Sequence, residues 1–361
     1  MLRYVIKRLI QAIPLIFGIT LLSYMLMTTA PGGPVGAMNF RPGTSPQERA
    51  QIAARLGIND PWLVQYTRWL LGDDWMRWDS DGDGIADQAV IVPLDSDGDG
   101  EPEPPGTRWG VLRGDFGDSF VSRRPVLTVL FERLPATLEL GISSLVIGVT
   151  VGIVIGILAA VRRGGVFDNV TRVMAVIFDA IPSFWLGLML ILLLGAQLQL
   201  LPLQGRCKAT LSDTCPPIYD RVQYLILPTF ILSTTLIAGY SRFTRASMLD
   251  VINQDYIRTA RAKGLSNRGV WFTHAARNAL IPIATFLGPA ITGILGGAVV
   301  TETIFSWPGV GRSIVQAVTQ RDYPVVMAVT IYAALATIIG YLLSDVLYGI
   351  IDPRIRYDGG R

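Results

Sequence analysis

The stretch LELGISSLVIGVTVGIVIGILAAV, residues 138–161, decides the fold class, because Glu139 is its only charged residue and most of the rest is apolar. A helix of about 20 apolar residues crosses the hydrocarbon core of a bilayer. Backbone polar groups in lipid must be satisfied within the spanning segment, which favours helices. The sequence therefore predicts an all-α membrane protein with about six transmembrane helices. The other apolar runs lie at residues 9–29, 173–201, 225–240, 280–300 and 325–347.

The overall composition agrees with a membrane protein. Hydrophobic residues make up 50% of the 361 residues and charged residues only 16%, whereas soluble domains carry about 25% charged residues. The net charge of +3 is small, and no basic face with interleaved aromatic residues indicates nucleic-acid binding. His274 is the only histidine, so neither a histidine metal site nor a catalytic triad can be built.

The basic residues predict the orientation. The short segments on the N-terminal side of the membrane would carry 16 Lys and Arg residues, and those on the other side five. Cytoplasmic loops are enriched in Lys and Arg, so we expect both termini in the cytoplasm. The first apolar run could instead be a signal peptide, but it is longer than the usual 7–15 apolar residues of a signal.

The long region after the first run contains one predicted helix, at residues 45–71. Ser45 is suited to the N-cap, Pro46 to the first helical position and Glu48 to the third, which together make a capping box. The region is expected to lie outside the cytoplasm.

Two acidic repeats follow this helix, DSDGDGIAD at 79–87 and DSDGDGEPE at 95–103. Alternating carboxylates can converge on one Ca²⁺ ion, and a glycine permits the sharp turn between them. The twelfth-position glutamate of an EF-hand is absent, so a calcium site and a solvated acidic loop remain alternatives. The candidate ligands are Asp79, Asp81, Asp83, Asp87, Asp95, Asp97, Asp99 and Glu103.

The two cysteines, Cys207 and Cys215, fall in an external loop between the third and fourth runs. Disulfides persist in oxidising compartments. The sequence therefore favours a disulfide between them, with two free thiols as the alternative.

A polar segment between the fourth and fifth runs is the most informative part of the chain. It reads SRFTRASMLDVINQDYIRTARAKGLSNRGVWFTHAARNALIPI, residues 241–283. Its Ala, Arg and Leu content predicts short helices, interrupted at Gly264. A short amphipathic helix on the cytoplasmic face is what an ATPase partner would need to push on. The chain itself has no G-x-x-x-x-G-K-[ST] phosphate loop.

This segment resembles the loop of permease subunits of ATP-binding-cassette importers, in particular the dipeptide and oligopeptide branch. The wider family has an EAA-type loop that ends in a glycine and is followed by Leu-Pro. Here residues 258–260 read Arg-Thr-Ala, Gly264 is retained, and Arg277 replaces the loop proline, with Pro282 five residues later. The resemblance assigns ATPase coupling to Arg258, Thr259, Ala260, Arg261, Ala262, Lys263, Gly264 and Leu265.

The resemblance extends over nearly the whole chain through an ordered set of sequence strings. They are APGGP at 30–34, LGINDPWLVQYTRWL at 56–70, GDFGDSF at 114–120, RLPATLELG at 133–141, AAVRRGGVFD at 159–168, IPSFWLG at 181–187, ETIFSWPGVGR at 302–312, RDYPVV at 321–326 and DPRIRY at 352–357. Residues 73–109 look like an insertion.

The resemblance implies a type I importer permease fold with an enlarged external loop. Its domains are a first transmembrane helix at 1–30, an external region at 31–133, a permease core of five helices at 134–350 with a coupling loop at 241–282, and a cytoplasmic tail at 351–361.

The same resemblance implies the partners. A second permease subunit would complete the translocation path in the bacterial inner membrane. Two ATPase subunits would hold ATP and Mg²⁺, and an external binding protein would deliver the peptide, so this chain would catalyse no reaction itself. Nickel chelates or oligosaccharides are alternative cargoes, and a stand-alone channel or secondary transporter is a less favoured reading.

Several polar or small residues lie inside the predicted spans. The substrate path and an ion pair with Arg172 or Arg242 are alternative interpretations of Asp179. Gly293, Gly296 and Gly297 form a small-residue face that suits helix packing or the path. The sequence also predicts that Glu139, Glu302 and Asp345 lie near the membrane interface.

The string FSWPGVG, residues 305–311, predicts turns after the fifth run. Its Trp307 is expected to lie at the membrane interface. A structural hairpin and a contact with the binding protein are alternative interpretations of this segment.

Overall fold

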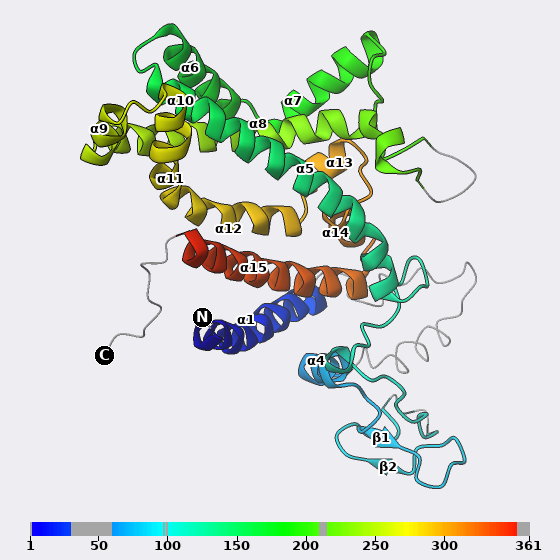
Figure 1. Cartoon of the computed structure of the whole chain (residues 1–361). Coiled ribbons are helices and arrows are strands. Elements are labelled where there is room, and N and C mark those ends of the chain that lie inside the picture. The colour runs from blue at the N-terminus through cyan, green and yellow to red at the C-terminus, as the bar shows by residue number, and fades with distance from the viewer. Residues whose placement is uncertain (1, 30–59, 97, 99, 209–214, 352–361) are drawn as a thin grey trace. The chain divides into compact units, whose positions relative to one another are not determined.

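The computed structural model describes residues 2–29, 60–96, 98, 100–208 and 215–351. These residues fall into two compact units. One unit contains the described residues of 1–12, 133–313 and 333–361, and the other those of 13–132 and 314–332. Figure 1 shows the chain with its elements labelled.

Long apolar helices make up most of the structure. Within the described residues, five helices are long and apolar enough to cross a membrane, or six if one bent pair counts as a single span. The prediction of an all-α membrane protein is confirmed. The helices that contain these spans are α1 (Leu2–Thr29), α5 (Val126–Val161), α6 (Val166–Ala180) with α7 (Ser183–Leu190), α8 (Val222–Val251), α12 (Ile281–Leu295) with α13 (Val299–Ile304), and α15 (Tyr323–Ile351).

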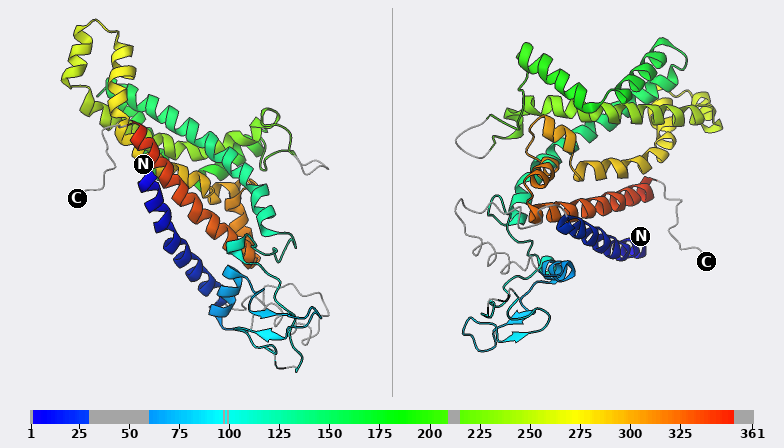
Figure 2. Two further views of the ribbon diagram at one scale, coloured as in Figure 1. Left: turned by 60° about the horizontal axis from the view of Figure 1, so that its bottom comes forward. Right: turned by 180° about the vertical axis from the view of Figure 1, so that it is seen from behind.

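The third predicted span is not one continuous helix. α6 ends at Ala180, α7 begins at Ser183, and the pair is bent by 96°, so the two helices diverge in Figures 1 and 2. Pro182 has no N–H and disfavours helical geometry in the residue before it. Ile181 is accordingly extended, with φ −76° and ψ 124°. A π-helical segment, η2 (Ile191–Gln197), continues α7.

Glycines of α5 allow it to pack closely on α8. A Cβ atom at Gly152 would lie 2.8 Å from the Cβ of Tyr240, and one at Gly156 would lie 2.6 Å from that of Thr244. The two glycines are four residues apart and therefore share one helix face. Small residues at this spacing allow membrane helices to approach each other, so any larger side chain here would separate α5 from α8.

The segment after α13 forms a buried turn rather than an interfacial one. Trp307 is fully buried, and its indole N–H donates to the carbonyl of Ala136 at 2.8 Å. Glu302 is also fully buried and accepts hydrogen bonds from the Thr137 hydroxyl at 3.0 Å and the Arg312 N–H at 2.8 Å. The predictions that Trp307 and Glu302 lie at the interface are therefore wrong. Both polar groups are buried because α5 supplies their partners.

The other unit contains short elements of the external region. α4 (Trp62–Leu71) begins directly after Pro61. The backbone of Pro61 is extended, with a ψ of 138°, so the helix does not continue back to Asp60. The prediction of one continuous helix over residues 45–71 is therefore wrong, because residues 60 and 61 are not helical. Residues 45–59 lie outside the described part of the chain. The remaining elements are β1 (Arg77–Trp78) paired antiparallel with β2 (Gln88–Ala89), and the 3₁₀ helix η1 (Val111–Arg113).

Two hydrogen bonds tie together distant parts of this unit. The Ser119 hydroxyl donates to Asp322 at 2.5 Å, and the Phe120 N–H donates to the other oxygen of the same carboxylate at 2.9 Å. α4 is held by the Tyr66 hydroxyl, which lies 3.0 Å from the hydroxyl of Thr20.

The buried turn predicts a large effect of one added methyl group. In Gly309→Ala, the new Cβ would overlap the carboxylate of Glu302, and overpacking of this kind costs about 1–3 kcal/mol. We expect a lower thermal unfolding midpoint of the purified protein in detergent. Gly293→Ala is the matched control, since no described atom lies within 4 Å of its Cβ. Equal midpoints for the two variants would contradict the packing described here.

Candidate functional site

A short helix projects from the end of α8 and carries most of the residues predicted to couple to an ATPase. This helix, α9 (Asp255–Ala262), buries only Ile257 and Ala260. Both side chains join an apolar cluster with Met248 of α8 and with Ala275. The helix is therefore fixed to the end of α8 along one face. Figure 2 shows the projecting segment in yellow.

The opposite face of α9 is open. The side chain of Arg258 is 74% exposed and lies 3.6 Å from the carboxylate of Asp255, which is 96% exposed. Gly264 ends the helical run with a φ of +77°, a conformation that residues with a side chain rarely adopt. The remaining predicted coupling residues, all exposed, are Thr259, Arg261, Ala262, Lys263 and Leu265.

A returning arm packs beside α9. It consists of α10 (Asn267–Gly269), the π-helical segment η4 (Val270–Ala275) and α11 (Ala276–Ala279). The Ser266 hydroxyl accepts the N–H of Gly269 at 3.3 Å and caps the arm. The guanidinium of Arg261 lies 5.2 Å from the ring centre of Trp271, within the range of a cation–π contact. We call α9 and this arm, residues 255–279, the helical module.

A buried ion pair joins α6 to α8 close to the helical module. Arg245 donates to both carboxylate oxygens of Asp168, at 2.5 and 2.8 Å, and the Gly164 N–H donates to the same carboxylate at 2.9 Å. The Asp168 side chain is 1% exposed. This pair was not predicted from the sequence, in which Arg245 falls in the polar segment after the fourth run.

Asp179 forms a second ion pair between the same two helices. Its carboxylate accepts one hydrogen bond from Arg242 at 2.5 Å. The two side chains are 37% and 48% exposed. Of the two partners that the sequence suggested, the structure thus selects Arg242.

The three glycines predicted on the fifth span have different surroundings. A Cβ at Gly293 would have no described atom within 4 Å, one at Gly296 would lie 3.3 Å from the Thr292 carbonyl oxygen, and one at Gly297 would lie 2.8 Å from the Gly311 nitrogen. Gly297 also has a φ of +83°. The glycine therefore permits the break between α12 and α13 and the close packing of the buried turn.

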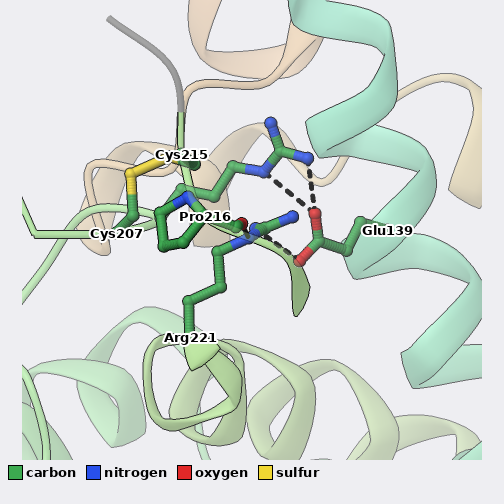
Figure 3. The surroundings of a disulfide bond; sticks show 6 residues. Glu139, Cys207, Cys215, Pro216 and Arg221 are labelled. Carbon is green, nitrogen blue, oxygen red and sulfur yellow. Dashed lines mark hydrogen bonds and ion pairs between the residues drawn. A yellow bond between two sulfur atoms is a disulfide. The ribbon is translucent and has the colours of Figure 1, made fainter. Parts of the chain in front are cut away.

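The loop after η2, which the sequence predicts to be external, contains a disulfide between Cys207 and Cys215, whose Cα atoms are 5.7 Å apart. Figure 3 shows it beside a cluster of charges centred on Glu139. Arg206 donates twice to one carboxylate oxygen, at 2.9 and 2.6 Å, and Arg221 donates to the other at 2.7 Å. Glu139 is therefore a structural link between α5 and this loop.

The first acidic repeat draws three carboxylates together. One oxygen from each of Asp79, Asp81 and Asp83 lies within 4.8 Å of the others. The backbone N–H groups of Gly84 and Gly82 donate to Asp79, at 2.7 and 2.6 Å, and hold its pKa below the usual range.

The other candidate calcium ligands have different partners. Asp87 bonds to the hydroxyl of Ser80, and Asp95 accepts the Gly98 N–H at 2.6 Å. Burial raises the pKa of Glu103, but its bonds to Ser96 and Arg77 outweigh burial and lower it below the usual value. Asp97 and Asp99 lie outside the described residues.

Two family models match this chain. A family model described as "binding-protein-dependent transport system inner membrane component" matches residues 152–357. A second model, for the N-terminal part of such membrane components, matches residues 1–77.

Curated relatives match from end to end. The oligopeptide transport system permease protein of Bacillus subtilis is 39% identical, with 99% of this chain and all of that protein covered. The dipeptide transport system permease protein of Escherichia coli K12 is 38% identical, with 99% of both chains covered. The di/tripeptide transport system permease protein of Pseudomonas aeruginosa is 36% identical, again over 99% of both.

A solved structure is more distant. The MetNI methionine transporter in an inward-facing form contains a chain that is 16% identical, with a TM-score of 0.45, 61% of this chain covered and 97% of that one. The full-length relatives and the family model decide the classification: the chain belongs to the family of binding-protein-dependent transport system inner membrane components.

Proposed function

We propose that this chain is the permease subunit of an ATP-driven importer and forms half of the translocation path for di- and oligopeptides. The family supports the role of a transport subunit, and the printed names of the full-length relatives favour peptides over nickel chelates or oligosaccharides. A related second permease subunit would complete the path. An external binding protein would supply the peptide, and two ATPase subunits would hydrolyse ATP, since this chain has no phosphate loop.

The observation that carries the coupling role is the way α9 is attached. Ile257 and Ala260 hold one face in the apolar cluster at the end of α8, while Arg258 and its neighbours leave the other face free for a partner. A force applied to α9 would therefore pass to α8 rather than bend a loose loop. We infer that the helical module docks on the ATPase subunits, which places it and both termini in the cytoplasm.

The departure from the EAA pattern is compatible with this role. Arg258 and Thr259 differ from the Glu-Ala of the wider family and are exposed, so they alter the contact surface. Ala260 agrees with the pattern and is buried. The helix thus keeps the alanine of the EAA pattern on its attached face and departs from the pattern on its exposed face.

The complete machine is tested by co-purification from the native membrane after mild solubilisation, with mass spectrometry, an ATPase assay and peptide uptake. We expect a second permease, ATPase subunits and a peptide-binding protein, together with ATP-dependent uptake of di- and oligopeptides. Recovery of this chain alone, with no ATPase activity while other transporters in the preparation stay assembled, would refute the proposal.

The attachment of α9 is tested by Ala260→Gln in the assembled transporter. The larger side chain does not fit the apolar cluster and should displace α9, at a cost of about 1–3 kcal/mol. We expect ATP-driven peptide uptake to fall by about tenfold, which corresponds to roughly 1.4 kcal/mol. Thr259→Gln enlarges the adjacent exposed residue and is the matched control. An equal loss in both variants would argue against attachment through the buried face.

Calcium binding by the first acidic repeat stays a prediction of the sequence. Extracellular modules bind Ca²⁺ with dissociation constants of about 10⁻⁴–10⁻³ M, which calorimetric titration of the purified chain can measure. We expect Asp79→Asn to abolish the signal. Asp74→Asn is the control in the same unit, because that carboxylate already bonds to Arg113. No binding by the unmodified chain, or equal binding by Asp79→Asn, would leave a solvated acidic loop as the interpretation.

A further inference from the structure

The two ion pairs between α6 and α8 differ in their surroundings. Asp168 is buried and accepts three hydrogen bonds, two of them from Arg245. Asp179 and Arg242 are 37% and 48% exposed and share one hydrogen bond. Among the residues that the structure describes, neither has a further hydrogen-bond partner. The carboxylate of the first pair is thus buried and well satisfied, whereas both groups of the second pair are exposed and retain unused hydrogen-bonding capacity.

The exposed pair does not suit a surface that faces lipid. Charged side chains inside a membrane face the interior of a bundle or a water-filled cavity. Arg172 is also exposed and precedes Asp179 by seven residues, or about two helical turns, so the two share one face of α6. Arg172 and Asp179 of α6 and Arg242 of α8 therefore form a polar stripe with a formal net charge of +1, while residues 173–178 of α6, between the two, are all apolar.

The stripe reaches the break between α6 and α7. Because Pro182 has no N–H, the carbonyl of Phe178 loses its helical donor. Irregular backbone at membrane depth is tolerated where it lines a water-filled cavity or is covered by protein. The charged side chains and the break in the backbone thus both indicate a water-filled region beside the end of α6.

The hydrogen-bonding groups that Asp179 and Arg242 leave unused match the two charged ends of a peptide. Arginine has five N–H donors in a planar fork and binds carboxylates through two bonds, while an aspartate oxygen accepts from an ammonium group. The charged ends of an extended dipeptide lie at most about 7 Å apart. The long side chain of Arg242 can open from Asp179 by a few ångströms to admit both ends.

We propose that Asp179 and Arg242 bind the charged ends of a peptide in the translocation path, Arg242 the terminal carboxylate and Asp179 the terminal ammonium. Without substrate the two side chains neutralise each other, and the substrate replaces each partner with a group of the same charge. The pair then selects peptides with free ends over capped ones. This inference rests on the proposed peptide-importer function.

The test uses the assembled transporter with its binding protein in proteoliposomes. Initial uptake is compared for one dipeptide, its C-terminal amide and its N-acetyl derivative, normalised to assembled complex. Arg242→Gln should reduce the uptake ratio of free dipeptide to amide by about tenfold, or roughly 1.4 kcal/mol. Asp179→Asn should reduce the ratio of free to N-acetyl dipeptide similarly. The preference of the binding protein for free or capped dipeptides is the same for every variant. It therefore cancels when the uptake ratios of two variants are compared.

Two further variants separate recognition from a structural role. Asp345→Asn removes the carboxylate of another partly exposed ion pair, with Arg8 at 3.5 Å, and should leave both ratios unchanged. The exchanged pair, Asp179→Arg with Arg242→Asp, should not restore the ratios.

The outcomes distinguish this inference from the proposed function. Equal losses for free and capped peptides, restored by the exchanged pair, would overturn recognition and leave a contact between helices or with the second permease. Unchanged ratios in both single variants would also overturn it, while the importer function would stand. Absence of any ATP-dependent uptake by the unmodified transporter would instead refute the proposed function.

Discussion

The buried ion pair of Asp168 and Arg245 is the contact on which the functional part of the structure depends. A charged pair removed from water is favourable only when its geometry and remaining hydrogen bonds are good. Here two bonds from Arg245 and one from the Gly164 N–H satisfy the Asp168 carboxylate. The contact fixes the start of α6, and the loop before it, to the part of α8 that continues into the helical module. Loss of either partner would leave an uncompensated charge there, which is more costly than loss of a surface pair.

The sequence revealed features that depend on local pattern and missed those that depend on distant partners. The spans were predictable because a run of apolar residues suits lipid whatever its neighbours are. The interruption at Gly264 was predictable because it reflects the preferences of a single residue. Pro182 was visible inside the third run, but its effect could be a mild kink or a complete break. The angle of 96° is a property of the packed helices.

Glu302 and Trp307 show why the remaining part of the site escaped prediction. A tryptophan by itself is typical of a membrane interface, and the sequence placed Glu302 at the end of an apolar run. They are buried because Thr137 and the Ala136 carbonyl, more than 160 residues away, satisfy their polar groups. Asp168 and Arg245 are likewise 77 residues apart. Without homologous sequences, no pattern along one chain indicates such pairs, although an isolated acid in an apolar helix marks a position where some partner is required.

A continuous set of contacts joins the helical module to the break in the third span. α9 packs through Ile257 on the cluster that contains Met248 of α8. One turn away along α8, Arg245 holds the start of α6 through Asp168. At the other end of α6, Asp179 bonds to Arg242 next to Pro182. In the proposed importer, movement of α9 by an ATPase would act on both ends of α6 through these pairs. The buried pair would transmit the displacement because two hydrogen bonds hold it away from water, whereas the exposed pair, held by one hydrogen bond, would be the first to open. An ATP-driven movement would then alter the peptide-binding residues without any direct contact between them and the ATPase.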